Sequence, residues 1–163
     1  TVEDIPKDAI LGGLPWDWEE YGGYLDAIER LQPGLNVAGM VGHCAVRFYV
    51  MGERAVEEQA TDEEKREMAD VVGRSIDAGA VGFSTNRYPP HVLPDGRAIP
   101  GTFADADELL EIAKAVGQER RVVLDEADGR FQVCAVGHDL RRPFKACRQR
   151  ETIFEMEDLG ARP

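Results

Sequence analysis

Ala80-Val81-Gly82-Phe83-Ser84-Thr85-Asn86-Arg87-Tyr88-Pro89-Pro90-His91 is the stretch that decides the expected fold of this chain. Its apolar beginning, residues 80–83, predicts a buried strand, and a polar loop restricted by prolines follows it. A helical pattern resumes near Ala104. A strand, a loop and a helix in this order form the repeating unit of an α/β protein, whose ligand site lies at the carboxyl ends of the strands.

Regular elements are expected before this unit as well. A helix is predicted from Leu14 onward, with Pro15 at its first helical position. An apolar strand is expected over residues 35–41, and a short helix over residues 44–51 ends at Gly52. The chain therefore alternates between helices and strands from its first third onward.

The clearest helical signal is a capping box, in which Thr61 caps a helix and Glu64 stands three residues later. One face of this helix is apolar and carries Met68, Val71, Val72 and Ile76. Gly79 stands where a left-handed residue ends a helix. A last clear helix covers residues 105–116, and residues 121–124 begin another strand. This order predicts the α/β class, with a parallel sheet covered by helices.

Composition sets limits on function. The chain has 163 residues, a net charge of −12 and no basic stripe, so we expect no nucleic-acid partner. No apolar run reaches the ~20 residues that a membrane helix needs, and we expect no membrane partner. Three cysteines without CxxC spacing (Cys44, Cys134 and Cys147) argue against a disulfide framework or a structural zinc site. They favour reduced thiols and a cytoplasmic location.

The chain is expected to have two unequal parts. Hydrophobic periodicity fades after about Leu124, and the balance of charges shifts near Gln118. We therefore expect residues 1–118 to form two βα units with an N-terminal helix. Residues 119–163 are expected to be a tail of different character, either a non-native continuation or a solvated extension.

Five short motifs follow one another in a familiar order: Gly-Leu-Pro-Trp-Asp-Trp-Glu (13–19), Val-Gly-His-Cys-Ala-Val-Arg (41–47), Val-Met-Gly-Glu-Arg (50–54), Gly-Ala-Val-Gly-Phe-Ser-Thr (79–85) and Pro-Gly-Thr-Phe-Ala (100–104). Together they resemble the D-aminoacylase branch of the amidohydrolase superfamily, the N-acyl-D-amino-acid deacylases. The resemblance covers roughly the first 118 residues. It implies a TIM-barrel hydrolase that acts on non-peptide C–N bonds, the amide bonds of N-acyl-D-amino acids.

The resemblance also implies zinc or another divalent metal, which would activate a water molecule for attack on the amide carbonyl. The family's His-x-His pair is absent here, because His43, His91 and His138 are isolated from one another. A complete barrel has ~250 residues, more than this chain. We therefore expect a partial TIM-barrel (β/α) segment that binds no metal, carries no catalytic residue and is inactive alone.

Six residues are candidates for contact with an N-acyl amino acid substrate. They stand at the carboxyl ends of the two strands, or in the helix and loop that follow: His43, Arg47, Ser84, Arg87, Tyr88 and His91. A substrate carboxylate needs a cation and hydroxyl donors, and the loop of residues 87–91 offers both. The alternatives are a buried histidine, a salt bridge from Arg47 to an acid, a serine that satisfies the end of the strand, and a plain surface loop.

Two further classes of function are open at this point. The chain can be a small non-enzymatic α/β binding module, or a subunit whose missing strands come from another chain. A partial sheet exposes unpaired edges, so we also expect self-association through them.

Overall fold

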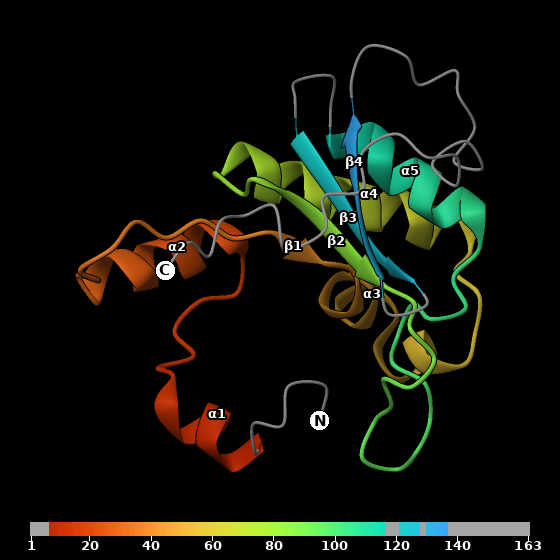
Figure 1. Cartoon of the computed structure of the whole chain (residues 1–163), viewed down its shortest axis with the longest axis horizontal. Helices are drawn as coiled ribbons and strands as arrows, with labels where there is room; N and C mark the ends of the chain where they lie inside the picture. Colours follow the sequence, from red (N-terminus) through yellow and green to blue (C-terminus); the bar gives the residue numbers. More distant parts are fainter. Residues whose placement is uncertain (1–6, 117–120, 128–129, 137–163) are drawn as a thin grey trace, which may run out of the picture.

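The computed structural model describes residues 7–116, 121–127 and 130–136. Two helices come first in the chain, and helices and strands then alternate up to β3 (Figure 1). The elements in chain order are α1 Lys7–Gly13, α2 Tyr21–Arg30, β1 Val41–Gly42, α3 His43–Met51, the 3₁₀-helix η1 Gly52–Val56, α4 Asp62–Asp77, β2 Gly82–Asn86, α5 Ala106–Val116, β3 Arg121–Ala127 and β4 Arg130–Val136.

The sheet has the strand order β1-β2-β3-β4. β1 and β3 both run parallel to the central strand β2, whose Phe83 lies beside Val41 on one side and Val123 on the other. The parallel strands are connected through helices, which confirms the expected α/β pattern for β1, β2 and β3. β4 pairs antiparallel with β3, and this hairpin was not predicted, although the sequence carries a signal for it: the dipeptide Asp128-Gly129, typical of two-residue hairpin turns, stands between the two strands.

Helices α4 and α5 lie side by side against one face of the sheet (Figure 1). The predicted capping box is present: the Glu64 amide donates to Thr61 Oγ1 at 3.2 Å, and the Thr61 amide donates to Glu64 Oε2 at 2.8 Å. Met68, Val72 and Ile112 from these helices are fully buried and pack with Phe83 of β2. The periodicity of the sequence therefore identified the apolar faces that form the core.

The predicted start of a helix at Leu14 is wrong, whereas the later part of that helix is present as α2. Residues 14–20 are not helical, Trp16 has a positive φ of 51°, and the helix begins only at Tyr21. The rings of Trp16 and Trp18 stack at 5.7 Å, and Trp18 also meets the edge of Tyr24 at 5.6 Å. A Cβ on Gly23 would lie 3.0 Å from the Trp18 side chain, so this close contact explains a glycine inside α2.

The predicted strand over residues 35–41 is also largely wrong, since only Val41 and Gly42 pair with β2. Before them the segment forms an isolated bond, from the Val81 amide to the Gly39 carbonyl at 3.0 Å. Gly39 lies against the Tyr21 hydroxyl, where a Cβ would be only 2.5 Å from the oxygen. The segment before Val41 therefore packs against the Tyr21 side chain and does not pair as a strand.

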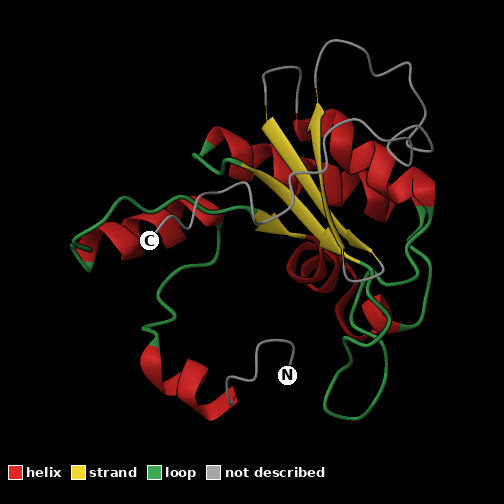
Figure 2. Cartoon of the chain, in the orientation of Figure 1, coloured by secondary structure: helices red, strands yellow, loops and turns green. Residues whose placement is uncertain are grey.

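Strand β2 starts two residues later than predicted and continues to Asn86, so Ser84 belongs to the strand and not to the loop. Phe83 and Thr85 are buried on the side of the helices. Ser84 and Asn86 are half-buried and lie on the opposite face, because successive side chains in a strand alternate. Figure 2 shows α4 and α5 together behind the strands, while α1 and α2 lie apart from the sheet.

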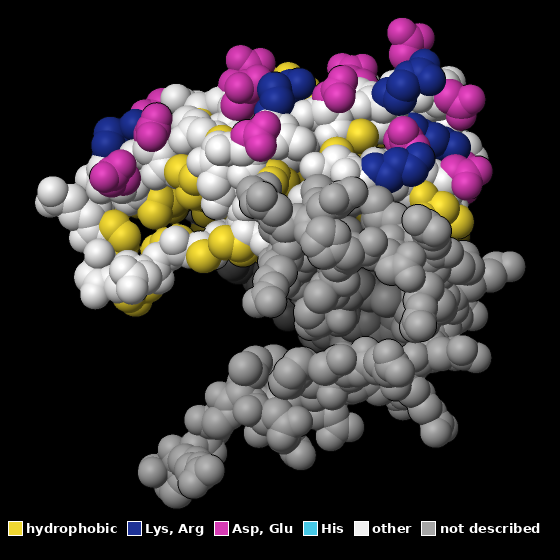
Figure 3. All heavy atoms as spheres, turned by 90° about the horizontal axis from the view of Figure 1, so that it is seen from above, with side chains coloured by type: hydrophobic (Ala, Val, Ile, Leu, Met, Phe, Trp, Pro, Cys, Tyr) yellow, Lys and Arg dark blue, Asp and Glu magenta, His cyan; other side chains and the backbone are white. Residues whose placement is uncertain are grey.

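The surface over the helical layer carries both signs of charge interspersed, as Figure 3 shows. Among the described residues, no helix is both long enough and apolar enough to span a bilayer. The predicted boundary near Gln118 and most of the tail lie outside the described residues, and the division into two parts stays a prediction.

Candidate functional site

The carboxyl end of β1 leads into a fully buried chain of polar side chains. His43 is the first residue of α3, and its Nδ1 lies 2.9 Å from Thr85 Oγ1 of β2. Its Nε2 lies 2.6 Å from Oε1 of Glu108 on α5. The exposed fractions are 1% for His43, 4% for Thr85 and 0% for Glu108. Because an ionised carboxylate only accepts, Nε2 donates to Glu108, and in this tautomer Nδ1 accepts from the Thr85 hydroxyl.

Arg47 completes this network one turn along α3. One guanidinium nitrogen donates to Glu108 Oε2, and Nε donates to the Ala55 carbonyl at 2.9 Å. The remaining nitrogen donates to the carbonyl of Glu58. Burial alone raises the pKa of Glu108, but the hydrogen bonds from His43 and Arg47 and the positive charge of Arg47 outweigh it and hold that pKa below its usual value. The buried charge of Arg47 is thus compensated by Glu108.

A glycine closes the imidazole from one side. Gly101 has a φ of 91°, and a Cβ built on it would lie 2.7 Å from His43 Nδ1 and 2.9 Å from Cε1. Phe83 meets the same ring edge-on, at a centroid distance of 5.5 Å. In the neighbouring turn, the Cys44 thiol donates to the Pro100 carbonyl at 3.0 Å, and burial raises the pKa of the Cys44 thiol. A thiol of raised pKa is a poor nucleophile.

The order carboxylate, imidazole, hydroxyl in Glu108, His43 and Thr85 is that of a hydrolase triad. A nucleophile, however, must reach a substrate, and Thr85 is buried in the strand beside Gly101 and Phe83. This geometry supports a structural connection between β1, β2, α3 and α5 and does not support covalent catalysis at Thr85.

A second polar cluster stands at the carboxyl end of β2. The side chain of Asn86 accepts from the Tyr88 amide at 2.9 Å, and its Nδ2 donates to His91 Nδ1 at 2.6 Å. The rings of Tyr88 and His91 meet edge-on at 5.1 Å. All three residues are half-buried, and so is Arg87 between them. A polar group here is therefore within reach of a ligand in solution.

The rest of this loop folds back on itself. Val92 bridges to Ala98, the Leu93 amide donates to the Arg97 carbonyl at 2.7 Å, and the Gly96 amide donates to the Leu93 carbonyl at 2.9 Å. Ile99 is buried where the loop returns to the core. The loop is thus a compact excursion whose two ends meet near the sheet.

The six predicted substrate residues fall into two groups. His43 and Arg47 lie on the helical side of the sheet and are buried. Ser84 lies on the opposite face, and the loop residues Arg87, Tyr88 and His91 follow the same strand. The contact of these residues with a substrate is not tested by the geometry and stays a prediction for all six.

Four residues of the two clusters were not predicted: Thr85, Asn86, Gly101 and Glu108. Glu108 is two residues into α5 and has the sequence signature of an exposed first-turn acid. Asn86 and Gly101 had a signal, because an asparagine at a strand end and a glycine after proline both favour turns.

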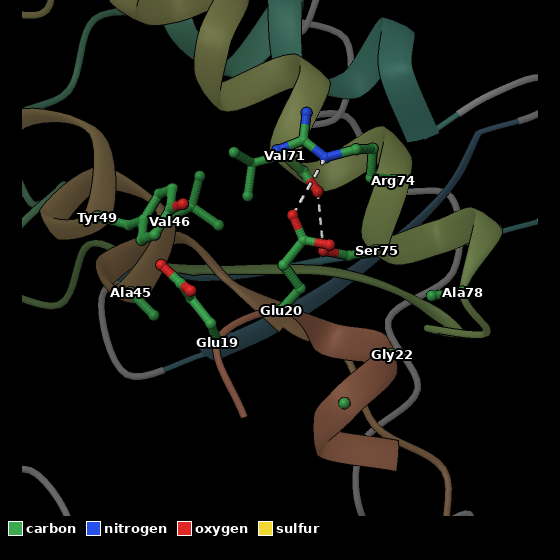
Figure 4. Close-up of a pocket in the computed structure, with 11 residues that line it drawn as sticks. Glu19, Glu20, Gly22, Ala45, Val46, Tyr49, Val71, Arg74, Ser75 and Ala78 are labelled. Atoms are coloured by element: carbon green, nitrogen blue, oxygen red, sulfur yellow. Dashed lines mark hydrogen bonds and ion pairs between the residues drawn. The ribbon is translucent and has the colours of Figure 1, made fainter. Parts of the chain in front are cut away.

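A hollow of 260 Å³ lies elsewhere, between α2, α3 and α4. Figure 4 shows Glu19 and Glu20 beside it, with Glu20 Oε1 3.8 Å from Arg74 Nε and the Ser75 hydroxyl bonded to the Val71 carbonyl. None of the six predicted residues lines this hollow. It is therefore separate from both polar clusters.

The described residues do not offer a metal site. Nowhere in ranges 7–116, 121–127 and 130–136 do three or more histidine, cysteine, aspartate or glutamate side chains gather closely enough to hold an ion. The part of the chain that is described thus lacks the ligand set that a catalytic zinc needs.

Comparisons with known proteins place this geometry in a family. No protein-family model matches the chain. D-aminoacylase of Alcaligenes xylosoxydans xylosoxydans is 31% identical over 109 residues, which are 67% of this chain and 20% of that protein. N-acyl-D-glutamate deacylase of the same organism is 34% identical over 110 residues, again 67% of this chain and 20% of that protein. The resemblance to the D-aminoacylase branch of the amidohydrolases is confirmed.

A solved structure agrees with these D-aminoacylase relatives. The N-acyl-D-glutamate deacylase from Bordetella bronchiseptica, complexed with zinc and a phosphonate inhibitor, superposes with a TM-score of 0.53 at 32% identity. The match covers 65% of this chain and 20% of that one. The chain therefore spans about a fifth of the length of the deacylases that it matches.

Proposed function

We propose that this chain forms part of the wall of a metal-dependent amidohydrolase that cleaves the amide bond of N-acyl-D-amino acids. The similarity to two deacylases and to the Bordetella structure supports this activity. The parallel run β1-β2-β3 supports the proposal that these strands are two βα units of a TIM barrel, because such barrels are built from parallel strands connected by helices. In this proposal the other face of the sheet, which carries Ser84 and Asn86, lines the barrel interior.

The loop after β2 is the proposed substrate contact. It stands at the carboxyl end of a barrel strand, where such enzymes place their functional residues. Asn86 bonds to both the Tyr88 amide and His91, and Arg87, the residue between Asn86 and Tyr88 in the sequence, is half-buried. A guanidinium and a phenol hydroxyl are donors suited to the carboxylate of an N-acyl amino acid. This juxtaposition is the observation that carries the proposal.

In such an enzyme the metal ligands would come from outside the described residues of this chain. The Bordetella relative was solved with zinc, whereas the described residues here contain no cluster of ligands. When bound, zinc would supply an activated water and polarise the substrate carbonyl. The residues of this chain would bind and orient the substrate only, so we propose that the 163-residue chain is inactive alone.

Two alternatives are weaker. A non-enzymatic binding module is not favoured, because the curated relatives with assigned activities are deacylases. The second alternative is a subunit whose barrel is completed by strands of another chain. Measurement of the size of the protein in solution tests it. Among the described strands, β1 has a partner on one side only, and self-association through its open edge would give dimers or larger species.

The first test uses the purified chain. Zinc content is measured by mass spectrometry, and hydrolysis is assayed with the N-acetyl derivatives of D-glutamate, D-aspartate and D-leucine, with the L-isomers as controls. We expect neither stoichiometric zinc nor turnover. Turnover with bound zinc would disprove the proposal that the chain is inactive alone.

The second test is a chimera. Residues 7–116 replace the matching fifth of the Bordetella deacylase, which supplies the remaining barrel. We expect zinc binding and D-selective hydrolysis. Tyr88→Phe in the chimera should lower kcat/KM on the order of 10–100-fold, the effect of losing one hydrogen bond to a charged group.

Tyr49→Phe is the matched control, because Tyr49 is an exposed tyrosine on α3 that lines the separate hollow. It should leave kcat/KM unchanged. A folded, zinc-loaded chimera in which both variants behave alike would contradict the assignment of the loop to the substrate.

A further inference from the structure

Both ends of the loop after β2 meet at one imidazole ring. The loop leaves the sheet after Asn86, next to Thr85, whose hydroxyl lies 2.9 Å from His43 Nδ1. It returns through Ile99 and Pro100 to Gly101, where a Cβ would lie only 2.7 Å from Nδ1 of the same ring. His43 therefore contacts both ends of the loop, Thr85 before it and Gly101 after it.

The other nitrogen of the His43 ring, Nε2, is also hydrogen-bonded. Glu108 accepts from Nε2 at 2.6 Å, and Arg47 fixes the other carboxylate oxygen. This arrangement determines which nitrogen carries the proton, so Nδ1 is left to accept from Thr85. His43 and Arg47 belong to α3, and Glu108 belongs to α5. Two helices of the core therefore hold the His43 ring in place, and both ends of the loop contact this ring.

The returning end depends on the absence of a side chain. Gly101 has a positive φ and no room for a Cβ beside the ring, and Thr102 anchors the turn by donating to the Ile99 carbonyl at 2.9 Å. The Cys44 thiol bonds to Pro100 in the same turn. The closure is therefore a specific fit between one glycine and one histidine.

We propose that His43 is a positioning residue: it closes the base of the loop formed by residues 86–100 and so fixes Tyr88 and His91 at the end of β2. The assignment of that loop to a substrate rests on the proposed function. The closure itself does not, because it concerns contacts within the free chain. Removing one contact should loosen the loop while the helical core keeps its order.

The test is amide hydrogen exchange of the intact chain without substrate. The loop amides of Tyr88, His91 and Leu93 have bonds within the loop, and the amides of α4 report on the core. Thr85→Val keeps the shape of the side chain and removes the donor to Nδ1. We expect exchange of the loop amides to rise at least 10-fold, with exchange in α4 within about 2-fold of the parent.

Thr85→Ser is the matched control, since serine retains the hydroxyl, and it should restore protection of the loop. Gly101→Ala repeats the test from the returning end, with Gly96→Ala as its control, because Gly96 has a similar positive φ of 86° and open space around it. In Gly101→Ala we expect faster exchange of the loop amides. In Gly96→Ala we expect the exchange of the Tyr88 and His91 amides to stay at the parent rate.

Two results would overturn the proposal. The first is loop exchange that is unchanged in Thr85→Val and Gly101→Ala. The second is loop exchange that rises only in step with α4, because that pattern indicates a general loss of stability. If Thr85→Val does not fold, Gly101→Ala alone decides between these outcomes. A deacylase assay of the chimera fails or succeeds independently of this measurement, so the two proposals are separable.

Discussion

Two polar clusters stand at neighbouring strand ends and differ in almost every physical respect. The cluster around His43 is dry, and each of its nitrogens and carboxylate oxygens has a partner within the protein. The cluster of Asn86, Tyr88 and His91 is half-buried, and the Asn86 side chain bonds to both His91 and the Tyr88 amide. Buried polar groups need complete pairing, whereas partly exposed ones keep access to water and ligands.

The comparison teaches that position at a strand end does not by itself make a residue a ligand contact. Both clusters follow parallel strands, where α/β enzymes bind substrates. One of them connects helices to the sheet, and the other is half-buried at the end of β2. The predictions below test this division of roles.

The largest effect is expected from breaking the buried charge pair. Glu108→Ala leaves the guanidinium of Arg47 buried without its partner and should destabilise the chain by about 3–5 kcal/mol. Urea denaturation followed by circular dichroism measures the loss. Glu111→Ala is the control on the same helix, since Glu111 makes a surface pair with Lys114 and should cost well under about 1 kcal/mol. Equal losses would contradict the special role of the buried network.

A smaller loss is expected at the glycine against the ring. Gly101→Ala combines the strain of a positive φ with a clash against His43, whereas Gly96→Ala has strain alone. The difference between the two variants in unfolding free energy should be about 1–3 kcal/mol, the usual cost of overpacking. No difference would mean that the ring moves aside without cost.

Acid should weaken the His43 cluster through Glu108. The pKa of Glu108 is lowered in the fold, so its contribution is present above the unfolded value of ~4.3 and is lost as pH falls through the lower folded value. Denaturation midpoints measured between about pH 7 and pH 3 should therefore fall with acid. Glu108→Gln should flatten this dependence, while a curve identical to the parent would show that Glu108 is not the responsible group.

The smallest effects are expected in the loop cluster. Asn86→Ala removes two hydrogen bonds of a half-buried side chain and should cost about 0.5–1.5 kcal/mol. Tyr88→Phe should change the unfolding free energy by less than about 0.5 kcal/mol, since the phenol is half-buried and its ring is kept. A loss at Tyr88 as large as that at Glu108 would assign the loop to the core and remove the contrast.

Helices were the most predictable part of the fold. The capping box at Thr61 and the apolar face with Met68 and Val72 are local patterns, and both are present as predicted. The segments around Trp16 and Gly39 were predicted wrongly: Trp16 stacks on Trp18, and Gly39 packs against Tyr21, and helix or strand patterns do not indicate such aromatic contacts. Propensity gives way to tertiary packing at such places.

The candidate site was predicted only in outline. The sequence indicated that His43, Arg47 and the loop of Arg87, Tyr88 and His91 stand at strand ends. It gave no sign that Glu108, 65 positions after His43, is the partner of both His43 and Arg47. A helix-start glutamate is ordinarily solvated, whereas Glu108 is fully buried where it meets His43 and Arg47 of α3.

The order of motifs in the sequence was by itself enough to determine the family resemblance, the alternation of strands and helices, and the residues of the apolar core, because each depends on local patterns. The separation of the polar residues into a sealed network and an accessible loop was decided only by tertiary structure. Burial and hydrogen-bond partners arise from segments that meet across the sheet, and no local pattern records which segments will meet.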